Sequence, residues 1–176
     1  MYAALNGVAL AIIAKAGTQS FTEAGADWYM NNLKALDYPT RVMFIREPFD
    51  RLESCYSFFK MLIQQGTKFN MLPEAALDSW EEFVDYILTH EDEHWAPQTD
   101  SVLYKGELTP THIMRFDELN KWWPEFFSAK LVHTNASERL EVPPYRVADL
   151  TEYYKNDIAE YNSAIRYEGV KEWPLP

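Results

Sequence analysis

The sequence predicts an α/β domain in which a mainly parallel sheet is flanked by helices. Residues 8–14 form a continuously apolar run, and Arg41–Ile45 forms a second one. Short apolar runs of this kind are typical of strands that are buried on both faces of a sheet. Each run is followed by a polar turn and then by apolar residues at helical spacing. This repeated order of strand, turn and helix indicates parallel strands joined by crossover helices.

Hydrophobic spacing and boundary residues place the helices that follow these strands. After the first strand, a helix is expected from Thr18 to just before Pro39. After the second strand, Asp50 is expected to be the N-cap of a helix that ends near Gly66. Ser79 is expected to cap a third helix, which extends through residue 89.

The second half of the chain is less regular. Residues 111–116 predict a strand, and residues 131–133 predict a last one. Residues 117–127 are expected to form a short helix that Pro124 breaks. A final helix is predicted from an apolar stripe that consists of Leu150, Tyr154, Ile158, Tyr161 and Ile165. No repeat or linker divides the sequence, so residues 1–176 are expected to form one domain.

Composition narrows the classes of protein that the chain can belong to. The 176 residues are 47% hydrophobic and carry a net charge of −11, which argues against nucleic acid as the main partner. Cys55 is the single cysteine, which excludes an internal disulfide and favours a reducing compartment. The run at residues 8–14 has no basic residues before it and is too short to span a membrane. A soluble, cytoplasmic protein is therefore expected.

The first candidate site is the polar turn after the first strand, at residues 15–20. Backbone N–H groups at a helix N-terminus favour an anion, and Gly17 allows the backbone to approach a phosphate closely. Thr18 and Ser20 add hydroxyl donors, and Lys15 adds a cation. The turn lacks the Gly-Lys-Ser/Thr of a Walker A motif. The alternative is an ordinary connection between strand and helix, with a lysine on the surface.

The second candidate site is the segment that follows the second strand, at residues 46–54. Arg46 comes at the end of a buried strand, where open α/β sheets bind their ligands. Ser54 lies in the helix that follows, and a guanidinium and a hydroxyl together suit a phosphate group. Alternatively, Arg46 caps the edge of the sheet, and Arg51 and Glu47 form a structural ion pair.

These two segments together resemble the PAPS-dependent sulfotransferases, most closely the carbohydrate sulfotransferases of the Golgi and their shorter bacterial and viral relatives. The resemblance implies a three-layer, P-loop-like sulfotransferase fold. It also implies that the first turn binds the 5′-phosphosulfate of the donor, through Lys15, Ala16, Gly17, Thr18, Gln19 and Ser20, with Ala14 in place of the usual proline. The family pattern for the 3′-phosphate is matched at Arg46, Pro48, Phe49, Arg51, Leu52 and Ser54.

The likeness continues in order along the chain. Residues 94–98 (His-Trp-Ala-Pro-Gln), 113–119, 133–137 and 154–161 are similar to later segments of the family. The resemblance suggests that Asn135 and Ser137 contact the nucleotide. The alternative is a turn with local hydrogen bonds. One departure is the short interval between Lys15 and Arg46, which lacks the strand and helix that family members often place there.

The resemblance implies in-line transfer of a sulfuryl group from PAPS to an acceptor hydroxyl or amine, with PAP as the product. Lys15 would stabilise the charge on the leaving group, and no metal is expected. His94 is the first choice for the base because histidine titrates near neutral pH. Glu23 is its rival. His94 and Trp95 could instead be a packing element.

The acceptor is expected to be a small molecule or a glycan. A second enzyme hypothesis is a P-loop-type nucleotide or phosphate-transfer protein, which would require magnesium. A third hypothesis is a degenerate sulfotransferase fold that binds a ligand without turnover.

Overall fold

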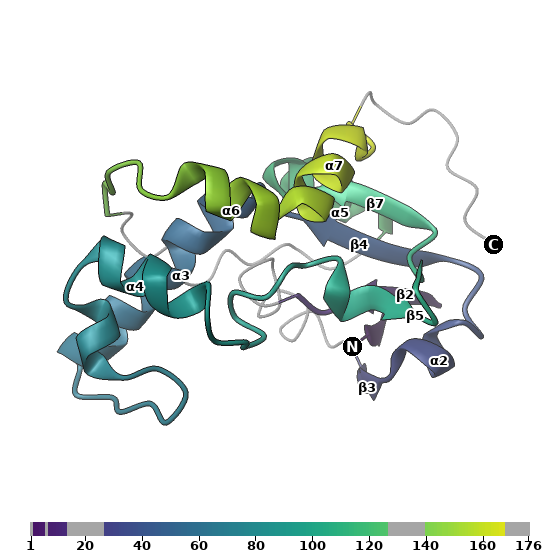
Figure 1. The fold of residues 1–176 in the computed structure, drawn as a ribbon. Helices are drawn as coiled ribbons and strands as arrows, with labels where there is room; N and C mark the ends of the chain where they lie inside the picture. The colour runs from purple at the N-terminus through teal and green to yellow at the C-terminus, as the bar shows by residue number, and fades with distance from the viewer. Residues whose placement is uncertain (1, 6, 14–26, 127–139, 168–176) are drawn as a thin grey trace.

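The computed structural model describes residues 2–5, 7–13, 27–126 and 140–167, and Figure 1 shows it as a ribbon. Its main sheet has the strand order β3-β1-β2-β4-β7. The strands β2, β4 and β7 are parallel neighbours, whereas β1 is antiparallel to both β2 and β3. The prediction of an α/β fold with a mainly parallel sheet is confirmed, and the sheet is mixed. The strands are β1 (Tyr2–Leu5), β2 (Val8–Ala11), β3 (Asp27–Met30), β4 (Arg41–Ile45) and β7 (His112–Arg115).

Both faces of this sheet are covered. Successive side chains of a strand point to opposite faces, and β4 follows that period. On one face, Phe44 belongs to the same buried cluster as Trp122 of α5 (Leu119–Phe126). On the other face, Ile45 shares a cluster with Ala164, which directly follows α7 (Lys155–Ser163). The sheet is therefore the middle of three layers.

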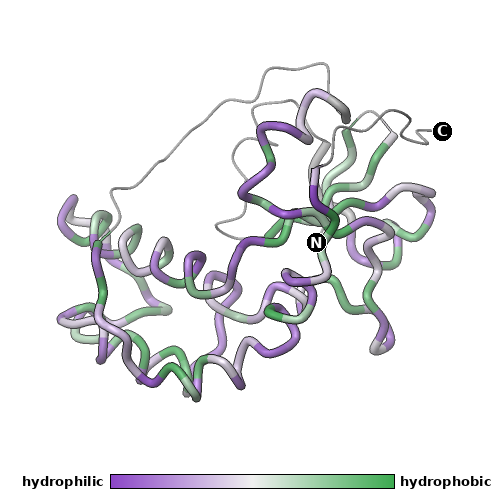
Figure 2. Tube along the Cα trace, turned by 90° about the horizontal axis from the view of Figure 1, so that it is seen from above, coloured by the Kyte–Doolittle hydropathy of each residue, from purple (hydrophilic) through white to green (hydrophobic). Residues whose placement is uncertain are grey.

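A third buried cluster lies among helices beside the sheet. It joins α3 (Pro48–Gln64), α4 (Trp80–Ile87) and α6 (Val147–Tyr153). Figure 1 shows α3 and α4 together on one side of the molecule, and α6 leading from them toward α7. Trp95 belongs to this helical cluster. Its ring centroid lies 6.3 Å from that of Phe59 and 6.4 Å from that of Phe83. In Figure 2, the coiled helical segments alternate between hydrophobic and hydrophilic residues.

Short elements complete the described part of the chain. None of the helices in the described ranges is long and apolar enough to cross a membrane. The short elements are α2 (Asn32–Ala35), η1 (Glu74–Leu77), η2 (Asp100–Val102), β5 (Leu103–Tyr104), β6 (Glu107–Leu108) and η3 (Phe116–Glu118).

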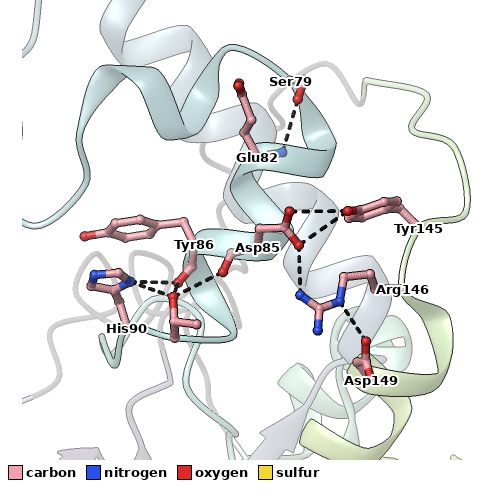
Figure 3. A network of polar contacts seen from close by, with 9 residues as sticks. Ser79, Glu82, Asp85, Tyr86, His90, Tyr145, Arg146 and Asp149 are labelled. Carbon is pink, nitrogen blue, oxygen red and sulfur yellow. Dashed lines mark hydrogen bonds and ion pairs between the residues drawn. The ribbon is translucent and has the colours of Figure 1, made fainter.

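Figure 3 shows a polar network that fastens the start of α6 to α4. Arg146 donates through Nη1 to Asp85 Oδ1 at 2.8 Å and through Nε to Asp149 Oδ2 at 2.7 Å. Tyr145 also contacts the Asp85 carboxylate. Ser79 caps α4 by accepting a hydrogen bond from Glu82 N, as the sequence predicted. These contacts hold α6 against the helical cluster.

Several predicted boundaries are wrong. In the described part of the helix expected from Thr18 to just before Pro39, which begins at residue 27, residues 27–30 form the strand β3 and Asn32–Ala35 is helical. The interval before Arg46 therefore contains the short strand β3 and the short helix α2. Aromatic residues such as those of β3 favour strands, and this preference prevails over the helical spacing.

Three further corrections concern helix ends. The N-cap of α3 is Glu47, whose carboxylate accepts from Asp50 N at 2.6 Å, so Asp50 is not the N-cap. Pro124 lies inside α5 and does not break it, because burial of Trp122 and Trp123 offsets the lost backbone hydrogen bond. The final helix is divided at Tyr154 into α6 and α7. The strand expected at residues 131–133 lies outside the described residues.

Burial of Tyr2 leads to a prediction about alkaline stability. Thr109 donates its hydroxyl proton to Val102 O, so it accepts from the Tyr2 hydroxyl, at 2.7 Å. Burial raises the pKa of Tyr2 to about 12. The unfolded state therefore ionises first, and stability that is present below pH 10 is lost as the pH rises toward 12. Urea unfolding at pH 9 and pH 11 should show a loss of about 1 kcal/mol from this group. Tyr2→Phe should lack that loss, and an equal loss in both proteins would contradict the prediction.

Candidate active site

The candidate site lies at the edge of the sheet where β2 and β4 end. These two strands are parallel neighbours, so their carboxyl ends meet at the same edge. Ile13, the last described residue before residue 27, is buried just beyond β2, and Arg46 directly follows β4. The structure thus brings the ends of the two motif-bearing strands together.

Part of the predicted site lies outside the described residues. Arg46, Ser54 and His94 are described. The predicted residues outside the description are Lys15, Ala16, Gly17, Thr18, Gln19, Ser20, Glu23, Asn135 and Ser137.

The side chain of Arg46 is oriented by two neighbours. Its Nε donates to Asp50 Oδ2 at 2.6 Å, and its guanidinium carbon lies 5.5 Å from the ring centroid of Phe116. Only 12% of the Arg46 side chain is exposed. A guanidinium carries five N–H donors, so the contact with Asp50 is compatible with binding an anion as well.

Ser54 lies on the same face of α3 as Asp50, because residues four apart in a helix are neighbours. Ser54 is buried and lies about 9 Å along the axis from the first residue of the helix. One turn further, Ser57 Oγ accepts from Leu140 N at 3.2 Å. Leu140 is the first described residue after residue 126. This face of α3 therefore extends from Asp50, which contacts Arg46, to the contact of Ser57 with Leu140.

Arg51 has a structural role in the helix core. Its guanidinium is almost fully buried and donates to the carbonyl oxygens of Ala96 at 3.0 Å and Glu93 at 3.2 Å. The carboxylate of Glu47 instead caps α3. Arg51 thus holds the backbone of residues 93–96 against α3.

Residues 93–99, here named the bridging segment, are held from three sides. Arg51 of α3 binds its first half. Tyr154, between α6 and α7, donates to Trp95 O at 2.6 Å. Burial raises the pKa of Tyr154, so its hydroxyl remains protonated and continues to donate at neutral pH. Asp157 of α7 is fully buried and accepts hydrogen bonds from the second half of the segment.

Gln98 of the bridging segment contacts the end of β4 directly. Its Oε1 accepts from Arg46 N at 3.0 Å, and its Nε2 donates to Arg46 O at 2.8 Å. The sequence analysis assigned no role to Gln98 or Asp157. Their contacts join residues 52 and 59 positions apart in the sequence, which no local pattern reveals. The only local signal is Asp157 itself, an acidic residue three positions after the apolar Tyr154 on the same helical face.

His94 lies in the first half of the bridging segment. Its Nδ1 is 2.6 Å from Asp92 Oδ1, and its ring centroid is 5.3 Å from that of Phe59. Phe59 follows Ser54 by about 7.5 Å along the axis of α3. A carboxylate beside the imidazole fixes its orientation, as in catalytic pairs, while the ring contact suits a packing role. Both alternatives therefore remain open for His94.

A second arginine, Arg115, lies at the same edge of the sheet as Arg46. Arg115 ends β7 and pairs in register with Ile45. Its guanidinium lies 3.9 Å from the ring centroid of Tyr161, and it donates to the Tyr161 hydroxyl and to Asp117. In the described ranges, no group of three or more His, Cys, Asp or Glu residues could hold a metal ion.

Parallel strands that end at one edge, with an arginine fixed there, are typical of α/β proteins that bind ligands at the carboxyl ends of their strands. The chain matches the profile of the sulfotransferase family over residues 12–164, and it belongs to that family. The matched range includes both candidate segments and extends to the end of α7. Neither the curated proteins nor the solved structures gave a match.

Proposed function

We propose that the chain is a PAPS-dependent sulfotransferase whose donor site lies at the carboxyl ends of β2 and β4. The proposal is carried by one observation: two adjacent parallel strands lead into the two segments that resemble the donor-binding motifs of the family. Membership of the sulfotransferase family supports a transferase in general. PAPS as donor, and a P-loop-like turn after β2, are the finer parts of the proposal.

In this proposal each of the two segments binds a different part of the donor. The turn from Lys15 to Ser20 binds the 5′-phosphosulfate, and Arg46 and Ser54 bind the 3′-phosphate. Support for the second part comes from Arg46, which is oriented by Asp50 at the strand end, and from Ser54 on the same face of α3. Asn135 and Ser137 add contacts to the nucleotide. Fixing the donor at both ends orients the sulfur for in-line attack.

The transfer step forms a bond between the acceptor oxygen or nitrogen and the sulfur. The bond between the sulfur and the bridging oxygen breaks, and PAP leaves with that oxygen. Lys15 stabilises the negative charge that develops on the bridging oxygen. The acceptor gives up its proton to a base, and the acceptor is a small molecule or a glycan. No metal takes part in this proposal.

The donor is tested by measuring Tm with and without saturating PAP in the presence of EDTA. A ligand that binds only the folded state stabilises it, by about 2.7 kcal/mol at a hundred times its Kd. A rise of several degrees supports the proposal. No shift at millimolar PAP, together with a shift caused by ATP only when magnesium is present, would favour the phosphate-transfer hypothesis. Turnover of PAPS with a panel of hydroxyl and amine acceptors separates an enzyme from a binding protein.

The base is predicted to be His94, held by Asp92. His94→Gln should lower kcat by about a hundredfold or more, since general base catalysis contributes about 10²–10⁴. The KM for PAPS should remain unchanged because His94 is not assigned to the donor. Glu23→Gln is the matched variant for the rival residue. If kcat falls only in Glu23→Gln, the base is Glu23, and His94 has the packing role suggested by its contact with Phe59.

A further inference from the structure

The side-chain amide of Gln98 satisfies both backbone polar groups of Arg46. The N–H of Arg46 donates to Gln98 Oε1 at 3.0 Å, and the carbonyl of Arg46 accepts from Gln98 Nε2 at 2.8 Å. A pair of hydrogen bonds of this kind fixes the peptide planes on both sides of a residue. The direction in which the Arg46 side chain leaves the backbone is therefore set by Gln98, immediately after β4 ends.

Gln98 is in turn held by a buried carboxylate. Gln98 is fully buried, and Asp157 Oδ2 accepts from its backbone N at 2.7 Å and from its Nε2 at 3.3 Å. The other oxygen, Oδ1, accepts from Thr99 N at 2.9 Å and from Thr99 Oγ1 at 2.8 Å. Removing a carboxylate from water is costly unless donors surround it, and here both of its oxygens accept two hydrogen bonds.

This chain of contacts runs from α7 to the strand end that carries Arg46. We infer that Gln98 is a positioning residue of the donor site, which acts through the backbone of Arg46, and that Asp157 holds Gln98 in place. The inference rests on the proposed function, in which Arg46 binds the 3′-phosphate of the donor. Gln98 touches neither the donor nor the acceptor in this scheme, so its effect is on the affinity for the nucleotide.

A double-mutant cycle on PAP binding tests this inference. The Kd for PAP is measured by calorimetry for the wild type, Gln98→Met, Arg46→Lys and the double variant, well below the lowest Tm of the four. Methionine approximates the volume of glutamine and removes both hydrogen bonds to Arg46. Each single change is expected to raise the Kd about tenfold, the cost of roughly one hydrogen bond to a charged group. Since Gln98 acts through Arg46, the double variant should be little worse than the weaker-binding single variant.

Tyr154→Phe is the matched control because it removes a buried hydrogen bond to the same bridging segment without contact with Arg46. It should lower Tm and leave the Kd for PAP unchanged. If Gln98→Met does not fold, as judged by circular dichroism, Gln98→Asn takes its place, since it keeps the amide but shortens its reach.

Each other outcome overturns a defined part of the scheme. If Gln98→Met binds PAP like the wild type while Arg46→Lys binds it more weakly, Gln98 is purely structural. The inference about Gln98 then fails, and the proposed function stands. If the two effects multiply to about a hundredfold, Gln98 does not act through Arg46. If the wild type does not bind PAP, the proposed function fails, and the inference fails with it.

Discussion

Replacing Arg46 with alanine is expected to abolish the rise in Tm that PAP causes. The guanidinium is held at the end of β4 by Asp50 and by the backbone contacts with Gln98, so it is ordered before a ligand arrives. Removing one partner of a charge-assisted contact costs about 2–5 kcal/mol, which corresponds to at least about a 30-fold loss of affinity. The measurement is Tm as a function of PAP concentration, in EDTA.

Arg41→Ala is the matched control for this experiment. Arg41 begins the same strand, at the opposite edge of the sheet, and donates to Thr109 O and Tyr38 O. Its loss should lower Tm in the absence of PAP and leave the PAP-dependent rise intact. If both variants keep the rise, Arg46 does not bind the donor. If both lose it, the effect of Arg46→Ala is a general one on the sheet.

Asp157→Ala is expected to cause a large loss of stability. The carboxylate is fully buried and accepts from the backbone N–H groups of Gln98 and Thr99, which would be left without this acceptor. Each buried polar group without a partner costs about 1–3 kcal/mol, so the loss should be about 2–6 kcal/mol. Typical domains have a stability of only about 5–15 kcal/mol. Urea unfolding of both proteins measures the difference.

Asp149→Ala provides the comparison for Asp157→Ala. Asp149 belongs to the preceding helix α6, and it pairs with Arg146 at the surface, where 55% of its side chain is exposed. Exposed ion pairs contribute little, so this variant should unfold at nearly the same urea concentration as the wild type. Equal losses in the two variants would mean that burial of Asp157 has no special importance.

The sequence predicts the central strands and the larger helices well because their residues are buried together with a clear period. The continuous apolar runs identify β2 and β4, and the stripe along α3 contains the buried Leu52, Cys55 and Phe59. The strand β1 was missed, although Asn6-Gly7 is a strong signal for a two-residue hairpin turn. Gly7 has φ +79°, the left-handed conformation that such a turn requires, and Leu5 pairs with Val8 across it.

The candidate site could be predicted only as far as its motifs are local. Arg46 and Ser54 could be proposed from the sequence because the end of the strand and the start of the helix are adjacent along the chain. The residues that fix Arg46 could not be predicted in this way, because Gln98 contacts it from a distant loop and Asp157 contacts Gln98 from a distant helix. The contacts of Arg51 with Ala96 O and Glu93 O could not be predicted either, because they join residues 45 and 42 positions apart in the sequence.

The dependence of β4 on α7 also concerns the order in which the protein is made. Synthesis proceeds from the N-terminus, so Arg46 leaves the ribosome 111 residues before Asp157. Until α7 has emerged and docked, the backbone N–H of Gln98 lacks its acceptor, the carboxylate of Asp157. Gln98 is then not held in place, and neither is Arg46, which Gln98 contacts at the end of β4. The nascent chain can therefore form its strands early, but it acquires an ordered Arg46 late. A ribosome-bound chain that ends before residue 157 should bind PAP far more weakly than the released protein.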